Sequence, residues 1–281
     1  MRYTLAFSCP DQPGIVYRTS EAVFALGGNI LDSEQFEDGD TGRFFMRISF
    51  ASEAEEPAVR AMLVGVAGQF AMDWRLSVEP ARPKVAIMVS KFDHCLGDLL
   101  YRVRTGELPM DVVAIIGNHP REVLGDTPIG DIPFHHLPVT SATKAAQEVE
   151  VRRIIEHSGT DLVILARYMQ VLSDDMAVFL SGRCINIHHS FLPGFKGAKP
   201  YHQAHERGVK MIGATAHYVS ADLDEGPIIH QDVEPVSHRD TPDDLVRKGR
   251  NIEQRVLAKA VRLHLLHRVF LNGKRTVVFG D

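Results

Sequence analysis

The sequence predicts an α/β protein of two domains: a small ferredoxin-like βαββαβ unit, followed by a doubly wound and mostly parallel sheet. Two observations lead to this prediction. The order of apolar strands and amphipathic helices changes after residue 79, and two prolines stand close together in the segment 79–83. Closely spaced prolines stiffen a chain, as in many linkers. We therefore expect one domain over residues 1–79, a linker over 80–83 and a second domain over 84–281.

The first domain is expected to contain four strands and two helices. Gly27-Gly28 ends the first helix, as glycines after a last turn do, and Pro57 begins the second at a position where proline is tolerated. The expected strands are 3–8, 29–37, 43–50 and 73–79, and the first helix is 14–26. The expected apolar stripes are Ile15, Val16, Ala22, Val23 and Leu26 on the first helix, and Val59, Met62, Leu63, Val66 and Phe70 on the second.

The second domain begins with an apolar run, 85–89, which is short enough for a buried parallel strand. Strands then alternate with helices, which is typical of a doubly wound sheet. An antiparallel pair over 211–219 and 227–234 and a long amphipathic helix over 242–268 complete the domain. The elements between them are helices at 94–105, 142–157 and 173–181 and strands at 111–117, 161–166 and 183–188.

Composition restricts the possible functions. The net charge of -5 argues against a general binder of nucleic acid or of membrane surfaces. No apolar run approaches the ~18 residues needed to span a bilayer, and Asp11 and Pro13 interrupt the N-terminal segment too early for a signal peptide. The three cysteines are far apart, so neither a disulfide framework nor a zinc motif is expected. A reducing cytoplasm is the simplest compartment.

The first domain resembles the ACT family of small ligand-sensing modules. Asp11-x-Pro-Gly14-Ile-Val stands at its first strand-to-helix turn, and Gly28-Asn29-Ile30 follows its first helix. The resemblance implies side-by-side pairing with an amino-acid effector at the interface, near Asp11, Gly14 and Asn29. Gly14 would let a ligand approach the backbone, and a helix N-terminus favours a carboxylate. The alternative is a purely structural turn in a dimerisation domain.

Three spaced motifs stand in the second domain: Asn186-x-His188-His-Ser-Phe-Leu-Pro193, then Gly213-x-Thr215-x-His217, then Leu223-Asp224-x-Gly226. Together they resemble the folate-dependent formyltransferase superfamily, which includes glycinamide ribonucleotide and methionyl-tRNA formyltransferases. One position departs from the family pattern, because Phe191 stands where the family has leucine.

Further segments are similar to one branch, the formyltetrahydrofolate deformylase family, which also places an ACT domain ahead of the catalytic domain. The resemblance implies hydrolysis of 10-formyltetrahydrofolate, without a cofactor, to tetrahydrofolate and formate for one-carbon and purine metabolism. It also implies a folate pocket. The segments that carry the resemblance to this branch are 90–98, 106–111, 118–120, 166–170 and 197–202. The residues expected to bind the substrate are Arg167, Tyr168, Met169, Leu172, Val219, Asp222 and Leu223, with a helix-start core as the alternative.

The residues of these motifs suit attack on a formyl group, which creates a tetrahedral oxyanion. Asn186 offers amide hydrogens and a protonated His188 offers a charge-assisted donor, and their spacing puts both on one face of a strand. Histidine needs a nearby carboxylate to stay protonated at neutral pH, and Asp224 is the candidate. Asp224 can also accept a proton from water. His217 and Thr215 are expected to support these catalytic groups.

The choice between water and an amine as nucleophile rests on the loop 90–94. Bulky Phe92 and anionic Asp93 receive a phosphate poorly, so we expect Phe92 to block an acceptor site and favour a hydrolase. A transferase to an amine acceptor is the alternative, and a non-enzymatic folate or amino-acid sensor is the third possibility.

Two further expectations concern metals and assembly. His202 and His205 lie i, i+3 on an expected helix, but no third ligand is indicated, so no metal is expected. ACT pairing and the C-terminal helix both suggest a homo-oligomer.

Overall fold

The computed structural model of the protein describes residues 1–192 and 200–280. The chain divides into two compact units. The first contains residues 1–81 with 266–272 and 276–280, and the second contains residues 82–265 with 273–275. From the sequence we expected all of residues 84–281 to form the second domain. In the structure, residues 266–272 and 276–280 belong to the first unit instead.

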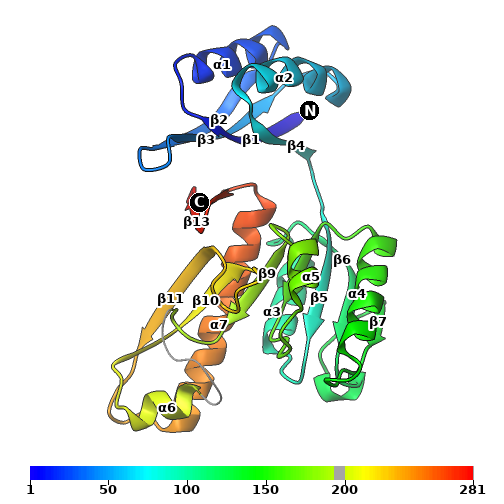
Figure 1. Ribbon diagram of the computed structural model, residues 1–281, viewed down its shortest axis with the longest axis vertical. Helices are drawn as coiled ribbons and strands as arrows, with labels where there is room; N and C mark the ends of the chain where they lie inside the picture. The colour runs from blue at the N-terminus through cyan, green and yellow to red at the C-terminus, as the bar shows by residue number, and fades with distance from the viewer. Residues whose placement is uncertain (193–199, 281) are drawn as a thin grey trace. The chain divides into compact units, whose positions relative to one another are not determined.

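The first unit has the expected βαββαβ order, and its four strands form an antiparallel sheet in the order β2-β3-β1-β4. This is the ferredoxin-like arrangement. Both helices cover one face of the sheet (Figure 1). The elements are β1 Arg2–Pro10, α1 Ile15–Ala25, β2 Asn29–Asp38, β3 Arg43–Ala51, α2 Glu56–Phe70 and β4 Asp73–Glu79.

The buried faces of α1 and α2 differ slightly from the expected stripes. Val16 is 38% exposed and Met62 is 40% exposed. The buried positions follow a spacing of three and four residues, so Met62, one residue before Leu63, is rotated by about 100° away from the core. Ile15, Thr19, Ala22 and Val23 are buried on α1, and Val59, Leu63, Ala67 and Phe70 on α2.

The C-terminal segment forms a two-stranded hairpin that the sequence analysis did not predict. Helix α7 ends at Leu265 rather than at 268, and His267 has φ 54, a left-handed conformation that cannot continue a helix. Strands β12 Val269–Asn272 and β13 Arg275–Val278 follow. Phe270 and Phe279 pack with Ala6 and Phe45, whose side chains point to the face of the first sheet that α1 and α2 leave open.

The second unit is built on a seven-stranded sheet in the order β11-β10-β9-β8-β5-β6-β7, parallel from β9 to β7 and antiparallel at β10 and β11. Helices α4 and α5 cover one face, and α3 and α7, which contact each other, cover the other (Figure 1). The strands are β5 Lys84–Val89, β6 Asp111–Gly117, β7 Phe134–His136, β8 Leu162–Leu165, β9 Cys184–His188, β10 Met211–Tyr218 and β11 Ile228–Pro235. The helices are α3 His94–Arg104, a 3-10 turn Arg121–Leu124, α4 Lys144–Ser158, α5 Asp174–Phe179, α6 Pro200–Glu206 and α7 Pro242–Leu265.

This topology places the functional side chains at one edge of the second sheet. The chain adds β6 and β7 on one side of β5, then returns to add β8 and β9 on the other side. Open α/β sheets bind ligands at the carboxyl ends of strands where such a reversal occurs. The loops after β5, β8 and β9 are therefore the expected walls of a site.

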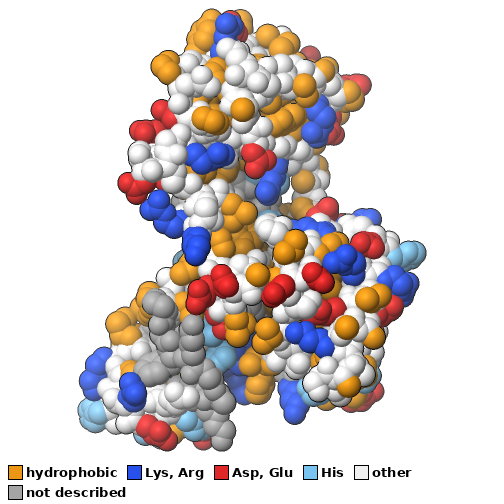
Figure 2. Space-filling model, in the orientation of Figure 1, with side chains coloured by type: hydrophobic (Ala, Val, Ile, Leu, Met, Phe, Trp, Pro, Cys, Tyr) orange, Lys and Arg blue, Asp and Glu red, His pale blue; other side chains and the backbone are white. Residues whose placement is uncertain are grey.

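The surface of each unit carries mixed charge. On the face shown in Figure 2, acidic and basic side chains are intermingled on both units. Among the described residues, no helix combines the length and the apolar character that crossing a membrane requires.

Candidate active site

Asn186 and His188 lie at the carboxyl end of β9, and the neighbouring strand β10 places a supporting residue opposite each of them. His217 pairs with Asn186, and Thr215 pairs with His188. Residues directly opposite each other in a sheet point to the same face. The imidazole Nε2 of His217 lies 3.2 Å from Nδ2 of Asn186, and its Nδ1 lies 2.9 Å from the carbonyl oxygen of Tyr218. His217 therefore fixes the orientation of the Asn186 amide.

Asp224 reaches the same place from the loop after β10. Its Oδ2 lies 3.2 Å from Nδ1 of His188, and its Oδ1 lies 3.7 Å from Nε2 of His217. Asp224 has φ 58, an uncommon conformation for a residue with a side chain, and such strain concentrates at functional sites. The three residues that the sequence proposed as catalytic therefore lie together.

A glycine makes this position of the Asp224 loop possible. A Cβ atom on Gly226 would lie 1.7 Å from the carbonyl oxygen of Tyr218. No side chain can occupy that space, so the Leu-Asp-x-Gly spacing has a steric cause here. The close approach brings the loop against β10, beside His217.

The charge of Asp224 is strongly stabilised. Burial alone would raise the pKa of its carboxyl group, but the contact with His188 and the nearby ring of His217 outweigh burial and hold the pKa well below its usual range. Asp224 is thus a carboxylate throughout the neutral range. It accepts the Nδ1 hydrogen of His188, and this leaves Nε2 of His188 as the atom available to a substrate.

The Nε2 atom of His188 is buried and has no hydrogen-bond partner among the described residues. Buried polar atoms in native proteins are nearly always paired. His188 also lines a cleft of about 220 Å³ together with Asn186 and Asp224. A ligand atom in this cleft would complete the hydrogen bonding of His188.

Thr215 supports the turn that follows β9. Its hydroxyl group donates to the carbonyl oxygen of Ser190 and accepts from the backbone N–H of Leu192 and from the side chain of Gln231. Thr215 is completely buried and does not line the cleft. It holds the backbone beyond His188 in place and has no direct access to a substrate.

The chain matches known proteins over nearly its whole length. A family model described as formyl transferase matches residues 83–261. Formyltetrahydrofolate deformylase from Corynebacterium sp. (strain P-1) is 49% identical over 283 residues, covering 99% of this chain and 98% of that protein. The chain belongs to the formyltetrahydrofolate deformylase family.

Solved structures separate the deformylases from the transferases by coverage. The formyltetrahydrofolate deformylase from Burkholderia mallei ATCC 23344 matches with a TM-score of 0.95 and 50% identity over 99% of both chains. Glycinamide ribonucleotide transformylase 1 from Symbiobacterium toebii matches with a TM-score of 0.66 and 30% identity, and covers 71% of this chain and 95% of its own. The deformylase thus matches both units, whereas the transformylase matches only part of the chain.

The cleft of this deformylase-family chain contains most of the residues proposed to bind a substrate. Asp222 is the exception, because it is exposed and does not line the cleft. Its carbonyl oxygen accepts hydrogen bonds from Ser220 and Glu225 instead, so it shapes the turn. Pro193 and residues 197–199, which belong to two of the motifs, lie outside the described residues. The proposed residues that line the cleft are Arg167, Tyr168, Met169, Leu172, Val219 and Leu223.

Phe92, which we expected to block an acceptor site, lies outside the cleft that contains Asn186, His188 and Asp224. Its side chain is 42% exposed and it does not line the cleft. The guanidinium groups of Arg167 and Arg250 lie 5.7 and 5.8 Å from the centre of its ring. Of these two arginines only Arg167 lines the cleft. Arg167 therefore lies between the Phe92 ring and the cleft residues in its contacts, since it touches the one and lines the other.

Beside the cleft lies a buried charged network that the sequence analysis did not predict. Glu253 of α7, only 1% exposed, accepts hydrogen bonds from Nε2 of His94 at 2.8 Å and from the hydroxyl of Tyr201 at 2.7 Å. Its Oε2 also lies 3.3 Å from Nε of Arg167. Burial would raise the pKa of Glu253, but His94 and Arg167 outweigh burial and lower it. The network thus keeps a buried carboxylate ionised.

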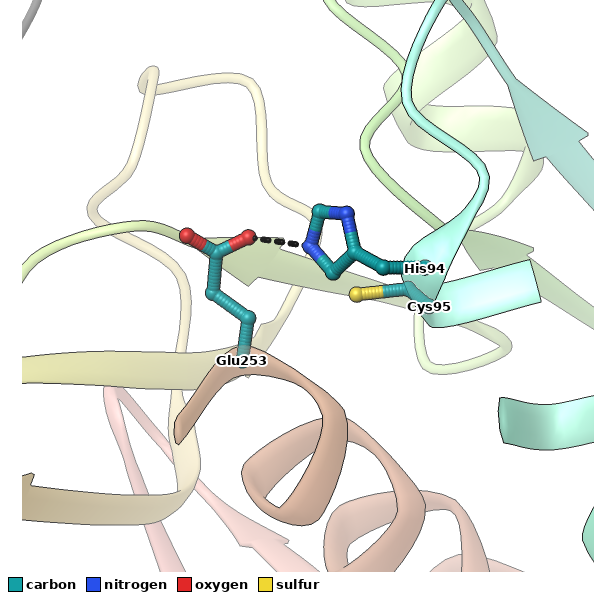
Figure 3. Close-up of side chains that lie close together, drawn as sticks. All are labelled: His94, Cys95 and Glu253. Atoms are coloured by element: carbon teal, nitrogen blue, oxygen red, sulfur yellow. Dashed lines mark hydrogen bonds and ion pairs between the residues drawn. The ribbon is translucent and has the colours of Figure 1, made fainter. Parts of the chain in front are cut away.

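His94, Cys95 and Glu253 lie close enough to resemble a metal site. Figure 3 shows His94 and Cys95, at the start of α3, facing Glu253, and their ligand atoms lie within 4.8 Å of one another. Burial, and then the charge of Glu253, raise the pKa of the Cys95 thiol well above its usual value, which disfavours the thiolate that a metal needs. Glu253 is already bonded to its neighbours, so the three residues fit an ion-pair network better than a metal centre.

The sequence carried a signal for this network that we did not use. Glu253 stands on the buried stripe of an amphipathic helix, between Gly249 and Val256. A glutamate on such a stripe is almost never fully buried unless it is paired. A Cβ on Gly249 would lie 2.0 Å from the ring of Tyr201, so this glycine makes room for the partner of Glu253.

The residues proposed for a regulatory ligand lie on the first unit. Asp11, Gly14 and Asn29 are all exposed. Gly14 has φ 95, which favours glycine, and immediately precedes α1. The backbone N–H of Asp11 donates to the carbonyl oxygen of Gly42. These contacts are those of a turn.

Proposed function

We propose that the chain hydrolyses 10-formyltetrahydrofolate to tetrahydrofolate and formate, with Asn186, His188 and Asp224 as the catalytic residues. The observation that carries the proposal is the pairing of Asp224 with Nδ1 of His188, which leaves the buried Nε2 of His188 for the cleft. The deformylase relatives that match the chain end to end favour hydrolysis over transfer to an amine.

The cleft suits each step of this reaction. Met169, Leu172 and Val219 line the cleft and would hold the folate ring, with the formyl oxygen toward His188 and Asn186, which line the same cleft. Water attacks the formyl carbon, and the electron pair of the carbonyl bond moves onto the oxygen. Hydrogen bonds from Asn186 and from protonated His188 stabilise the oxyanion that forms. The C–N10 bond then breaks as N10 takes up a proton.

Asp224 acts mainly through His188. A carboxyl group with so low a pKa is a weak base, so any proton that Asp224 takes from water is passed on at once. Its carboxylate lies 3.2 Å from Nδ1 of His188 and fixes the orientation of the ring, as a carboxylate beside a catalytic histidine commonly does. No cofactor is needed for hydrolysis by this route.

The experiment that tests the activity supplies the purified chain with 10-formyltetrahydrofolate labelled in the formyl group. We expect labelled formate without any added acceptor. Excess glycinamide ribonucleotide should neither receive the label nor change the rate. Transfer of label to the ribonucleotide would restore the transferase alternative, and retention of label on the folate would leave the chain as a binding protein.

We also propose that the first unit is an ACT domain that pairs in a homo-oligomer and binds an amino-acid effector near Asp11, Gly14 and Asn29. Support comes from the βαββαβ topology and from the left-handed Gly14 at the start of α1. A reducing cytoplasm suits Cys9, Cys95 and Cys184, which are buried and free. Calorimetry with each amino acid and light scattering test the effector and the assembly. A monomer that binds no amino acid would contradict both proposals.

A further inference from the structure

Arg167 has a backbone conformation that its side chain makes unfavourable. It follows β8, at the edge of the sheet where the cleft lies, and has φ 63. This left-handed conformation is uncommon for residues other than glycine, and strain of this kind clusters at ligand sites. Glycine would adopt it without strain. The presence of arginine here calls for a role of its guanidinium group.

The guanidinium group of Arg167 is buried and incompletely paired. The side chain is 10% exposed, and neither Nε nor Nη1 has a hydrogen-bond partner among the described residues. Arg167 lines the same cleft as His188, whose Nε2 is also buried and has no hydrogen-bond partner among the described residues. Arg167 and His188 therefore both line one cleft, and each has a buried nitrogen without a hydrogen-bond partner among the described residues. A ligand that pairs both must carry more than one acceptor atom.

The charged network around Glu253 fixes the position of the Arg167 side chain. It leaves Nε and Nη1 of Arg167 without a hydrogen-bond partner among the described residues. Glu253 lies 3.3 Å from Nε of Arg167 and is itself fixed by His94 and Tyr201. The ring of Phe92 lies 5.7 Å from the guanidinium carbon. These contacts fix the position of the positive charge of Arg167. Its remaining N–H groups stay available for a ligand, as a preorganised anion site requires.

The chemistry of hydrolysis offers a ligand with two oxygens. Attack by water forms a new C–O bond, so the tetrahedral intermediate carries two oxygens on the formyl carbon. Transfer to an amine would place one oxygen and one nitrogen there. When the C–N10 bond breaks, one proton goes to N10, one goes to solvent, and formate leaves with both oxygens. The planar fork of a guanidinium group matches such a pair of oxygens.

We propose that Arg167 is a further catalytic residue, which binds the oxygen contributed by water and then the carboxylate of formate, while Asn186 and His188 hold the original formyl oxygen. This inference rests on the proposed hydrolysis and adds the residue that selects water. A positive charge at this position favours the deprotonation of attacking water and repels a protonated amine. Arg167 thus supplies the discrimination that we expected from Phe92.

The test compares three variants of the full chain. Arg167→Gly relieves the backbone strain and removes the donors, and Arg167→Lys keeps the charge without the fork. Arg250→Met is the matched control, because Arg250 lies 5.8 Å from the same Phe92 ring but is exposed and does not line the cleft. The measurements are kcat, KM for 10-formyltetrahydrofolate and product inhibition by sodium formate, against sodium chloride at equal ionic strength.

We expect Arg167→Gly to lower kcat by about 10²-fold, as loss of one oxyanion donor does, with little change in KM. Formate inhibition should weaken at least ~10-fold in both Arg167 variants, since lysine cannot make the paired contact. Added guanidinium chloride should restore turnover in Arg167→Gly alone. The Arg250→Met control should behave as the unmodified chain.

Two results would overturn the assignment. One is an unchanged formate inhibition in Arg167→Lys together with a near-native kcat. The other is an Arg167→Gly chain that melts at the native temperature and turns over at the native rate. If Arg167→Gly does not fold, the lysine variant decides alone. If the unmodified chain releases no formate at all, the proposed hydrolysis fails first, and the two failures are thereby distinguished.

Discussion

The Oδ2 atom of Asp224 lies 3.2 Å from Nδ1 of His188, whose other ring nitrogen, Nε2, has no hydrogen-bond partner in the described part of the chain. This relationship gives the carboxylate control over which nitrogen faces the cleft. An amide in its place can accept the same hydrogen bond, but it carries no negative charge. Replacing Asp224 by asparagine therefore tests whether charge or shape matters at residue 224.

Asp224→Asn is expected to lower kcat by about 10³-fold or more, because both the charge beside His188 and a proton acceptor are lost. Folate should still bind, since apolar side chains such as Met169, Leu172 and Val219 line the cleft and the substitution leaves them unchanged. Steady-state kinetics and calorimetry with tetrahydrofolate measure the two effects. Asp222→Asn is the matched control, being an exposed carboxylate of the same loop outside the cleft. Equal activity in both variants would remove Asp224 from the mechanism.

Gly226→Ala is predicted to reduce turnover by at least ~10²-fold although no catalytic side chain changes. The added Cβ would lie 1.7 Å from the carbonyl oxygen of Tyr218, so the loop must move and carry Asp224 with it. Gly65→Ala in α2 is the control, because nothing lies within 4 Å of its added Cβ. That change should raise helix stability by up to ~1 kcal/mol and leave kcat unaltered. Native turnover in a folded Gly226→Ala chain would contradict the role of this close approach.

The catalytic part of the site was accessible to sequence reasoning because it depends on local spacing. Asn186 and His188 share a face since they are two residues apart on a strand, and the three motifs identified Asp224. The network around Arg167 was not accessible in the same way. It joins His94, Tyr201 and Glu253 from three separate elements, and no periodicity predicts which buried charges will meet.

The fold shows the same division between local and distant effects. The βαββαβ order and the alternating second domain follow from apolar periodicity, and the structure confirms both. The C-terminal hairpin was missed because the apolar pattern of α7 was extended to 268, through His267, although Asn272-Gly273 between two apolar runs is a turn signal. That this hairpin covers Phe45 of the first sheet is a tertiary fact that the local sequence does not contain.

Glu253→Gln is expected to destabilise the second unit by about 3–5 kcal/mol, because it leaves the buried Arg167 charge without its partner. Tyr201→Phe removes only one hydrogen bond to a charged group and should cost about 1.5–3 kcal/mol. Tyr101→Phe is the control, since Tyr101 is 53% exposed on α3. Urea denaturation followed by circular dichroism gives all three values. An unchanged free energy of unfolding in Glu253→Gln would show that the network does not stabilise the fold.

His267 gives the first unit a predicted sensitivity to acid. Burial, together with the positive charges of Arg75 and Arg47, lowers the pKa of His267 to about 4. An unfolded histidine has a pKa of ~6.5. Between these values the unfolded chain binds a proton that the folded chain does not, so stability falls as the pH falls below ~6.5. The loss approaches about 1.4 kcal/mol per pH unit down to pH 4, and above pH 7 the group has no effect.

His267→Asn should remove this sensitivity, and asparagine also tolerates the left-handed conformation at φ 54. We expect the free energy of unfolding to fall between pH 7.5 and pH 5 by about 2 kcal/mol less in the variant than in the unmodified chain. The single tryptophan, Trp74, lies in β4, so its fluorescence reports unfolding of the first unit. His238→Asn, at an exposed histidine of the second unit, should follow the unmodified chain. Parallel pH profiles for all three proteins would show that His267 takes up its proton in the folded state as readily as in the unfolded one.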